Sequence, residues 1–451
     1  MGVGQLSAAD PEVGLPQLAK LIAVENVVYI AHDGRSTGLL AQSWYIAPDG
    51  RSLRLRLRPH VTFHDGTPVT SAIVAQIVQA QLLRALGPAL QHTAGTRAIS
   101  ENEVEIEQER LSPFLVESLD FPIQKPGGAG IGTGPFSIER GPSSIEMRAN
   151  DAYYLGAPTI RRIVLRSYPT VRAAWADLLR GQVDMLYDVG LDALDSLQAS
   201  SKVSVYTYPR SYAYVILLNT RRPALASREV RRALGQAIDR GQLIREALSN
   251  HGTPAEGPVW PQHWAYNQTF PTYRFDPSGA SKTLKGRLHF KCIFADGAPF
   301  ERLALAVQKQ LAAVGVDMEV ESVSIDEVVD RVTKRADFDA VLFDAQLAPN
   351  IFRPYQFWRS GAPRNYGKFS SARVDAALDA VRYAADDRTY AAAALEFQRA
   401  MIDDPPAVYL AWGERAQAVT HRFVVTAEPG RSLVSALRLM KPATESPASR
   451  N

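Results

Sequence analysis

The chain alternates between stretches with the period of a strand and stretches with the period of a helix. Residues 53–58 alternate strictly between Leu and Arg, which puts three Leu on one face of a strand and three Arg on the other. A solvated sheet face explains the Arg row more simply than an anion-binding strip does. A helix is predicted next, capped by Thr70 or Ser71, from the apolar positions Ile73, Val74, Ile77, Val78 and Leu82.

The same alternation continues through the second half of the chain. An apolar stripe from Phe300 to Val314 predicts a helix, Gly315 stands where a helix-ending glycine belongs, and residues 316–320 then alternate as a strand. Ser227 is placed to cap a further helix, and no segment repeats at a fixed period. The pattern predicts an α/β fold with mixed sheets.

Composition narrows the class of protein. A chain of 451 residues exceeds one domain of roughly 100 to 200, so two or three lobes are expected. The 50 Lys plus Arg against 47 Asp plus Glu leave a charge of +3 with no polybasic block, which argues against a nucleic-acid partner.

No stretch of the sequence reaches the roughly 18 apolar residues that are needed to cross a bilayer. The start lacks the plan of a secretory signal, which leaves a cytoplasmic protein or an exported one whose signal was removed.

A search for reactive groups predicts no catalytic centre, metal site or cofactor. His60 and His64 flank an extended segment instead of lying on one helix face, and no Gly-x-Ser-x-Gly elbow is present. Cys292, the one cysteine, lies in an apolar run and is expected to be a buried structural thiol. The glycine-dense residues 126–134 lack the spacing of a nucleotide-binding loop and are predicted to form a flexible crossover between lobes.

Several motifs resemble those of a known family. Residues 38–44, Gly-Leu-Leu-Ala-Gln-Ser-Trp, resemble the P-x-L-A-x-S-W stretch of the cluster C solute-binding proteins of ABC importers, the peptide, nickel and opine binders. Residues 58–70 are similar to its L-R-x-G-V-x-F-H-D-G-T-P-x-T, and residues 132–136 to its G-T-G-P-Y/F. Further matches follow in family order at residues 150–154, 217–220, 230–240 and 252–258.

The resemblance implies a two-lobed periplasmic-binding-protein fold with a hinge and a subdomain inserted in the first lobe. Such proteins close over a ligand and perform no reaction. The motifs assign residues 1–48, 132–212 and 408–451 to the first lobe, residues 49–131 to the inserted subdomain and residues 213–407 to the second lobe.

One departure from the family bears on the ligand. Peptide-binding members carry G-W-x-x-D, in which the aspartate receives the α-ammonium group of the peptide. Here Asp344 stands at the glycine and Ala348 at the aspartate. Because a buried ammonium group without a partner costs several kcal/mol, a peptide held by its amino terminus is disfavoured unless Asp344 has taken over.

The resemblance also nominates residues that contact the ligand. They lie on the first-lobe strand before the Leu-Ala-x-Ser-Trp motif, on the two hinge strands, and in the segment that follows the second-lobe Phe-Asp. The full set is Tyr29, His32, Tyr212, Tyr214, Asp344, Gln346, Asn350, Arg353, Trp358, Asn365 and Trp412.

The expected function is therefore that of an extracytoplasmic receptor of an ABC importer. It would capture a short peptide, an opine-like conjugate or an oligosaccharide and deliver it to permease subunits in the membrane, working as a monomer in the periplasm or outside the cell. A sensory module of the same fold is the alternative. A hydrolase with two carboxylates in a cleft is a remote third.

Overall fold

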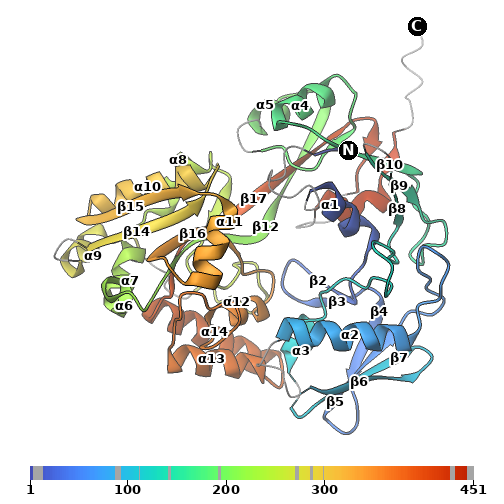
Figure 1. Ribbon diagram of the computed structural model, residues 1–451, viewed down its shortest axis with the longest axis horizontal. Coiled ribbons are helices and arrows are strands. Elements are labelled where there is room, and N and C mark those ends of the chain that lie inside the picture. Colours follow the sequence, from blue (N-terminus) through green and yellow to red (C-terminus); the bar gives the residue numbers. More distant parts are fainter. Residues whose placement is uncertain are drawn as a thin grey trace.

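The computed structural model describes residues 1–3, 14–86, 93–110, 112–140, 144–190, 194–269, 274–284, 288–297, 299–426 and 432–443. It has two lobes joined by two long strands, with a smaller subdomain beside the first lobe (Figure 1). The two-lobed α/β fold with mixed sheets is confirmed. Among the described residues, no helix is long and apolar enough to cross a membrane.

One eleven-stranded sheet extends through both lobes, with nearly all of its strands in a single path and β13 attached to β17. The second lobe contributes β15 (Val316–Val323), β14 (Leu288–Ala295), β16 (Ala340–Gln346) and β13 (Gly252–Pro254). The first lobe contributes β11 (Met185–Leu186), β1 (Gly2–Val3), β10 (Arg162–Ser167), β9 (Ile145–Ala149) and β8 (Phe136–Arg140).

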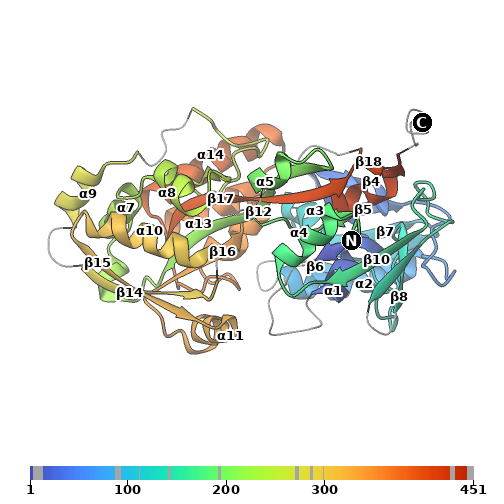
Figure 2. The ribbon, with the colours of Figure 1, turned by 90° about the horizontal axis from the view of Figure 1, so that it is seen from above.

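The strands β12 (Val203–Leu218) and β17 (Ala407–Thr420) belong to both lobes. They run antiparallel from the pair Val203 and Thr420 in the first lobe to the pair Leu217 and Ala407 in the second. Seen from above, they cross side by side between the two masses of the protein (Figure 2). These two strands form the hinge.

The inserted subdomain is a four-stranded sheet covered by a helix. Its strands are β4 (Ala41–Ile46), β5 (Ser52–Leu57), β7 (Glu103–Gln108) and β6 (Thr93–Ser100), and its helices are α2 (Ser71–Leu86) and α3 (Pro113–Glu117). The three Leu of β5 are buried and Arg54 pairs with Glu105 on the other face, as the alternation predicts. The Thr70 hydroxyl accepts the Ile73 N–H at 3.3 Å and so caps α2, one of the two capping residues expected.

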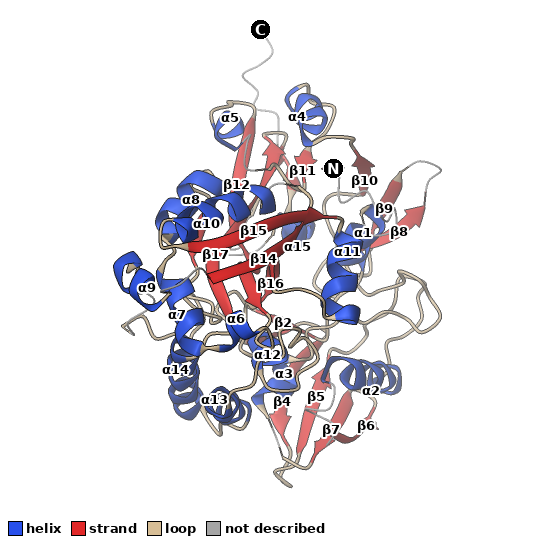
Figure 3. Cartoon of the chain, turned by 60° about the vertical axis from the view of Figure 1, so that its left-hand side comes forward, coloured by secondary structure: helices blue, strands red, loops and turns tan. Residues whose placement is uncertain are grey.

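Helices cover both faces of the large sheet in each lobe (Figure 3). In the first lobe, α1 (Leu15–Ala23) and α15 (Leu433–Ala436) pack on one face and α4 (Val171–Leu179) and α5 (Leu194–Gln198) on the other. The second-lobe helices are α6 (Pro223–Ala226), α7 (Arg228–Gln236), α8 (Arg240–Ala247), α9 (Pro277–Thr283), α10 (Phe300–Ala312), α11 (Ile325–Val329), α12 (Phe352–Trp358), α13 (Ala372–Arg382) and α14 (Asp387–Asp403). The remaining elements are β2 (Val28–Ile30), β3 (Ser36–Gly38), β18 (Phe423–Val424), β19 (Lys441–Pro442) and the short helices Asp330–Arg335 and Leu437–Leu439.

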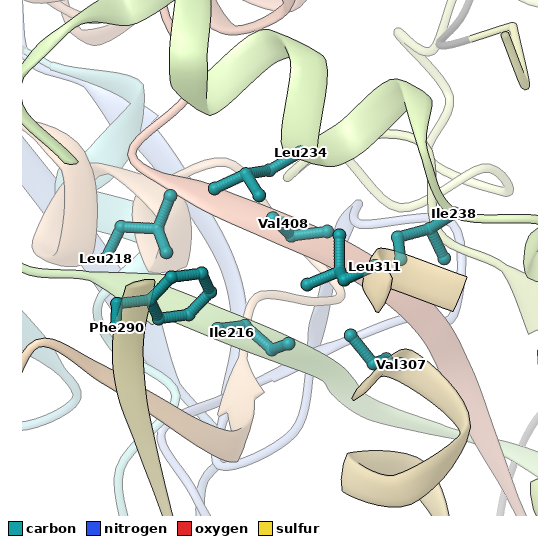
Figure 4. Close-up of a pocket in the computed structure, with 8 residues that line it drawn as sticks. All are labelled: Ile216, Leu218, Leu234, Ile238, Phe290, Val307, Leu311 and Val408. Carbon is teal, nitrogen blue, oxygen red and sulfur yellow. The ribbon is translucent and has the colours of Figure 1, made fainter. Parts of the chain in front are cut away.

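The predicted helix-to-strand unit of the second lobe is confirmed. The helix α10 is followed by Gly315 in the left-handed conformation, with φ of +85°, and then by β15. Beneath α7 and α10, eight apolar side chains from β12, β14, β17, these helices and Ile238, which follows α7, fill the core and leave no room for a water molecule (Figure 4). This lobe therefore has a tightly packed core of its own.

The domain boundaries stay a prediction. The small sheet includes β4, which precedes the proposed start of the subdomain at residue 49, and the proposed boundaries at 212 and 408 fall within the hinge strands.

The glycine-dense segment has a role that the expected flexible crossover does not describe. A Cβ at Gly132 would lie 2.3 Å from the carbonyl oxygen of Ala23, and one at Gly134 would lie 2.6 Å from the same atom. The Gly134 N–H donates to that carbonyl at 2.9 Å, and the Gly132 carbonyl accepts the His64 N–H at 3.0 Å. These glycines permit close backbone packing where the subdomain returns to the first lobe.

Candidate functional site

The carboxyl ends of the parallel second-lobe strands point toward the hinge. The strand β14 is parallel to both β15 and β16, so their carboxyl ends share one edge of the sheet. Gln346, at the end of β16, lies opposite Tyr212 on β12. In α/β proteins the crevice outside the carboxyl ends of the strands is the usual ligand site. In this chain that edge coincides with the hinge.

The hinge strands lose their regular pairing at this point. Between the pairs Pro209–Glu414 and Ala213–Trp412, three residues of β12 oppose the single Gly413 of β17. Such a bulge redirects side chains and bends the strand. A Cβ at Gly413 would lie 3.1 Å from the Tyr214 ring and 3.5 Å from Arg210 Cδ, so the missing side chain makes room for both.

Arg210 on β12 forms an ion pair with Asp344 on β16. Its Nη2 lies 2.8 Å from Asp344 Oδ2, its Nη1 lies 3.4 Å from the Tyr214 hydroxyl, and its guanidinium carbon lies 5.1 Å from the centre of the Tyr212 ring. The two charged side chains are 20% and 30% exposed. Burial lowers the pKa of Arg210, but the charge and hydrogen bond of Asp344 together with Tyr214 outweigh burial, so the net shift is upward. Both side chains of the pair keep some exposed surface.

A second arginine lies near the first on the neighbouring strand. The Nε of Arg415 on β17 lies 3.2 Å from Asp188 Oδ2, and its Nη1 donates to the Tyr187 hydroxyl at 3.2 Å. Its charge acts to lower the pKa of Arg210. The hinge thus gathers two guanidinium groups, each with one carboxylate partner and a tyrosine ring.

Four of the predicted ligand residues meet at this hinge: Tyr212, Tyr214, Asp344 and Gln346. Burial raises the pKa of Tyr214, and the nearby Arg210 opposes that shift. The Tyr214 ring also packs edge-on against Phe300 at the start of α10, with ring centres 5.9 Å apart. The Tyr214 side chain is buried, and its hydroxyl accepts the Arg210 Nη1–H at 3.4 Å.

Two other predicted residues, His32 and Trp412, lie in a stack of rings that joins the hinge to the first lobe. Trp412 of β17 packs edge-on against Trp260 at 4.9 Å, and Trp260 packs edge-on against His32 at 5.3 Å. The Trp260 indole N–H donates to the His32 carbonyl, and the His32 ring is hydrogen-bonded to Gln262. Tyr29 lies on β2, one residue before that strand ends at Ile30, and pairs with Thr37 of β3. Trp412 is almost fully buried.

The remaining four predicted residues have structural contacts that account for them. Asn350 is buried and donates to the Glu117 carbonyl at 3.2 Å, and Arg353 pairs with Asp120 at 3.1 Å. Asn365 holds a loop by bonds to Arg359, Phe369 and the Phe369 N–H. Trp358 has no exposed surface. Their role as ligand residues stays a prediction, and the structure does not gather them at the hinge.

Arg210 is the hinge residue that sequence reasoning missed. It precedes the predicted Tyr212 by two positions, so strand alternation from the named tyrosine was the available signal. The bulge, which sets where the side chain points, has no such signal because it depends on pairing with Gly413.

Other reactive groups of the described chain do not assemble into a centre. No group of three His, Cys, Asp or Glu side chains among the described residues is close enough to hold a metal ion. Cys292 is buried, which raises the pKa of its thiol to about 12. A cavity of about 260 Å³ in the first lobe is lined by Met1, by residues of and beside β10 and β11, by Val419 of β17 and by residues of the C-terminal part, and by none of the predicted ligand residues.

Comparison with known proteins identifies the family. Residues 36–367 match the model of the bacterial extracellular solute-binding proteins, family 5 Middle. The chain belongs to this family. Its members are the solute-binding components of ABC importers, and those similar to this chain are named for peptide, nickel and opine ligands.

Individual relatives are distant. The chain is 24% identical over 408 residues to the probable D,D-dipeptide-binding periplasmic protein DdpA of Escherichia coli K12, covering 83% of this chain and 78% of that protein. The structure of the oligopeptide-binding protein AppA from Bacillus subtilis with a nonapeptide superposes with a TM-score of 0.79 at 19% identity, covering 98% of this chain and 99% of that one. AgaA from A. tumefaciens R10 with agropinic acid gives a TM-score of 0.79 at 21% identity, covering 99% and 98%. These structural likenesses show the fold.

Proposed function

We propose that this family 5 protein is the receptor of an ABC importer outside the cytoplasm, and that it delivers a small organic solute to permease subunits in the membrane. The observation that carries the proposal is the meeting of the second-lobe strand ends with the hinge, where Arg210, Asp344, Tyr212 and Tyr214 gather. In this proposal the chain acts as a monomer in the periplasm, the two lobes close over the solute, and no bond of the solute is broken.

The charges at the hinge favour a solute with an anionic group. Asp344 is already paired with Arg210, so a peptide ammonium group would have to displace a guanidinium to reach it. Ala348, where peptide-binding relatives are expected to carry the anchoring aspartate, offers no carboxylate. We propose that a solute carboxylate binds Arg210 and that the adjoining apolar or planar part lies against the partly exposed ring of Tyr212. An opine-like conjugate has this chemistry.

A thermal-shift screen tests the proposal. The panel holds opine-like conjugates including agropinic acid, D,D-dipeptides, peptides of three to nine residues, oligosaccharides and nickel–histidine complexes. A solute at 100 times its Kd raises the free energy of unfolding by about 2.7 kcal/mol. We expect stabilisation by carboxylate-bearing conjugates, and expect N-acetylation of any peptide that binds to change its Kd less than about threefold, because no ammonium anchor is proposed. Binding that requires a free amine contradicts the proposed ligand class.

Two further measurements separate the alternatives. Mass spectrometry of the bound solute after long incubation should recover it unchanged, and a converted product would favour the hydrolase. Deletion of the gene should abolish uptake of the identified solute, whereas loss of a transcriptional or motile response with normal uptake would favour the sensory module.

A further inference from the structure

Residues 113–120, hereafter the clasp segment, are attached to the first lobe through contacts with residues 26–28. The clasp segment contains α3 and the residues that follow. The Val27 and Val28 N–H groups donate to the carbonyls of Phe121 and Leu119 at 3.3 and 3.5 Å, and the Asn26 side chain donates to Asp120 at 2.6 Å. The clasp segment therefore moves with the first-lobe chain.

The front of the clasp segment is docked on the second lobe through Glu117. One oxygen of the Glu117 carboxylate accepts the Tyr390 hydroxyl of α14 at 2.8 Å, and the other accepts the Phe352 N–H of α12 at 3.2 Å. The Glu117 carbonyl accepts the Asn350 side chain. Glu117 is 7% exposed and Tyr390 4% exposed. A carboxylate this deeply buried needs such partners, so the contact is specific.

Rings and a second ion pair extend the docked surface. Phe114 packs on Phe352 at 5.7 Å and edge-on against Tyr355 at 5.2 Å between ring centres. Asp120 pairs with Arg353 at 3.1 Å, with the side chains 21% and 16% exposed. The buried apolar cluster of the subdomain is continuous across this contact with that of α12, α13 and α14.

This contact lies on the side of the molecule away from the hinge. The clasp segment and α12 meet below, while β12 and β17 cross above (Figures 1 and 3). A rotation that opens the lobes about the hinge strands must pull Glu117 away from Tyr390 and Phe352. Every group in the contact belongs to the chain itself, so its formation requires no solute atom.

We propose that the clasp segment, with Glu117 at its centre, holds the two lobes together in the protein without solute. It thereby sets the fraction of closed molecules that is present before a solute binds. This device goes beyond the proposed import function and does not depend on which solute is bound. A solute that binds the closed form has an apparent affinity scaled by the closed fraction.

The test measures closure directly, with spin labels on two exposed alanines. Ala80 on α2 and Ala392 on α14 are replaced by cysteine, and buried Cys292 stays unlabelled. Distances are recorded by double electron–electron resonance without solute. Tyr390→Phe removes the hydroxyl bond to Glu117 but keeps the ring that packs against Trp264. Tyr168→Phe is the matched control, because Tyr168 donates to the Asp177 carboxylate at 2.9 Å within the first lobe.

We expect a short-distance population in the parent protein that falls about fivefold or more in Tyr390→Phe and is unchanged in Tyr168→Phe. Arg353→Gln, which breaks the pair with Asp120, should lower the same population. The proposal is overturned if Tyr390→Phe leaves the distances unaltered, or if the parent protein without solute shows only the long distance. Equal melting temperatures of the two tyrosine variants would confirm that the shift does not come from unfolding.

Discussion

The hinge and the clasp segment, two of the places where the lobes meet, are built from different chemistry. At the hinge, Arg210, Asp344 and Tyr212 are partly exposed, and Arg210 and Asp344 keep 20% and 30% of their side-chain surface, whereas Tyr214 beside them is buried. At the clasp segment, Glu117 and its partners are buried and satisfied by groups of the chain. A site that recognises a solute needs accessible groups, whereas a contact that sets a closed geometry needs satisfied ones. The comparison assigns recognition to the hinge and closure to the clasp segment.

The largest effect is expected from breaking the hinge ion pair. Arg210→Gln removes the proposed contact with the solute carboxylate and leaves Asp344 without its partner, so affinity for the solute found in the screen should fall about 100-fold. Arg180→Gln, which removes a surface pair with Asp177, is the control and should change affinity less than about twofold. Isothermal titration calorimetry gives both values. If Asp344→Asn weakens binding more than Arg210→Gln does, the solute presents a cation instead of an anion.

The next largest effect concerns the first-lobe hairpin that docks beside the clasp segment. Gly34 has a φ of +83°, and a Cβ there would lie 2.3 Å from the His263 ring of the second lobe and 2.7 Å from the Pro349 carbonyl. Gly34→Ala should therefore oppose closure and weaken solute binding about 30-fold, with little change in the fold of either lobe. Gly257→Ala, where nothing lies within 4 Å of the new Cβ, is the control. Equal affinities for the two variants would show that the hairpin does not gate closure.

A smaller effect is expected from pH. Burial raises the pKa of Glu117 to about 7, against the opposing effects of the Tyr390 hydroxyl, the Phe352 N–H and Arg353. Three other groups face this contact. Asp120 is paired with Arg353, and the charge of Arg35 lowers the pKa of Tyr390. The third is His263, and burial lowers the pKa of its ring to about 4. In the open form Glu117 is exposed and expected near its ordinary pKa.

The sign follows from the two pKa values. The closed form binds the proton more tightly, so the added stability of closure is complete below the ordinary pKa of Glu117 and is lost as the pH rises through about 7. The closed-to-open ratio, measured with the two spin labels, should rise about tenfold from pH 7.5 to pH 6. Glu117→Gln should flatten this dependence. A ratio that stays constant or decreases when the pH is lowered from 7.5 to 6 in the parent protein would contradict the assignment.

The sequence predicted the framework well because periodicity depends on local burial. The alternation in β5, the stripe of α10 with its terminal Gly315, and the order of the motifs from residue 38 to residue 258 all led to the observed architecture and family. The sequence did not predict that the hinge and the clasp segment have different roles. Asn350 and Arg353 are polar residues in a segment that follows a binding motif, yet their partners Glu117 and Asp120 lie more than 200 positions away, and only the folded chain reveals that they are already occupied.

The smallest effect on binding is expected at Asn365, which separates a loop-holding residue from a ligand residue. Its side chain donates to the Arg359 and Phe369 carbonyls and accepts the Phe369 N–H, so its hydrogen bonds are used within the loop. Asn365→Ala should lower stability by about 2 kcal/mol, because buried backbone groups lose their partner, and change solute affinity less than about twofold. Chemical denaturation and calorimetry on the same sample measure the two effects. A large loss of affinity at unchanged stability would return Asn365 to the recognition site and weaken the assignment of recognition to the hinge.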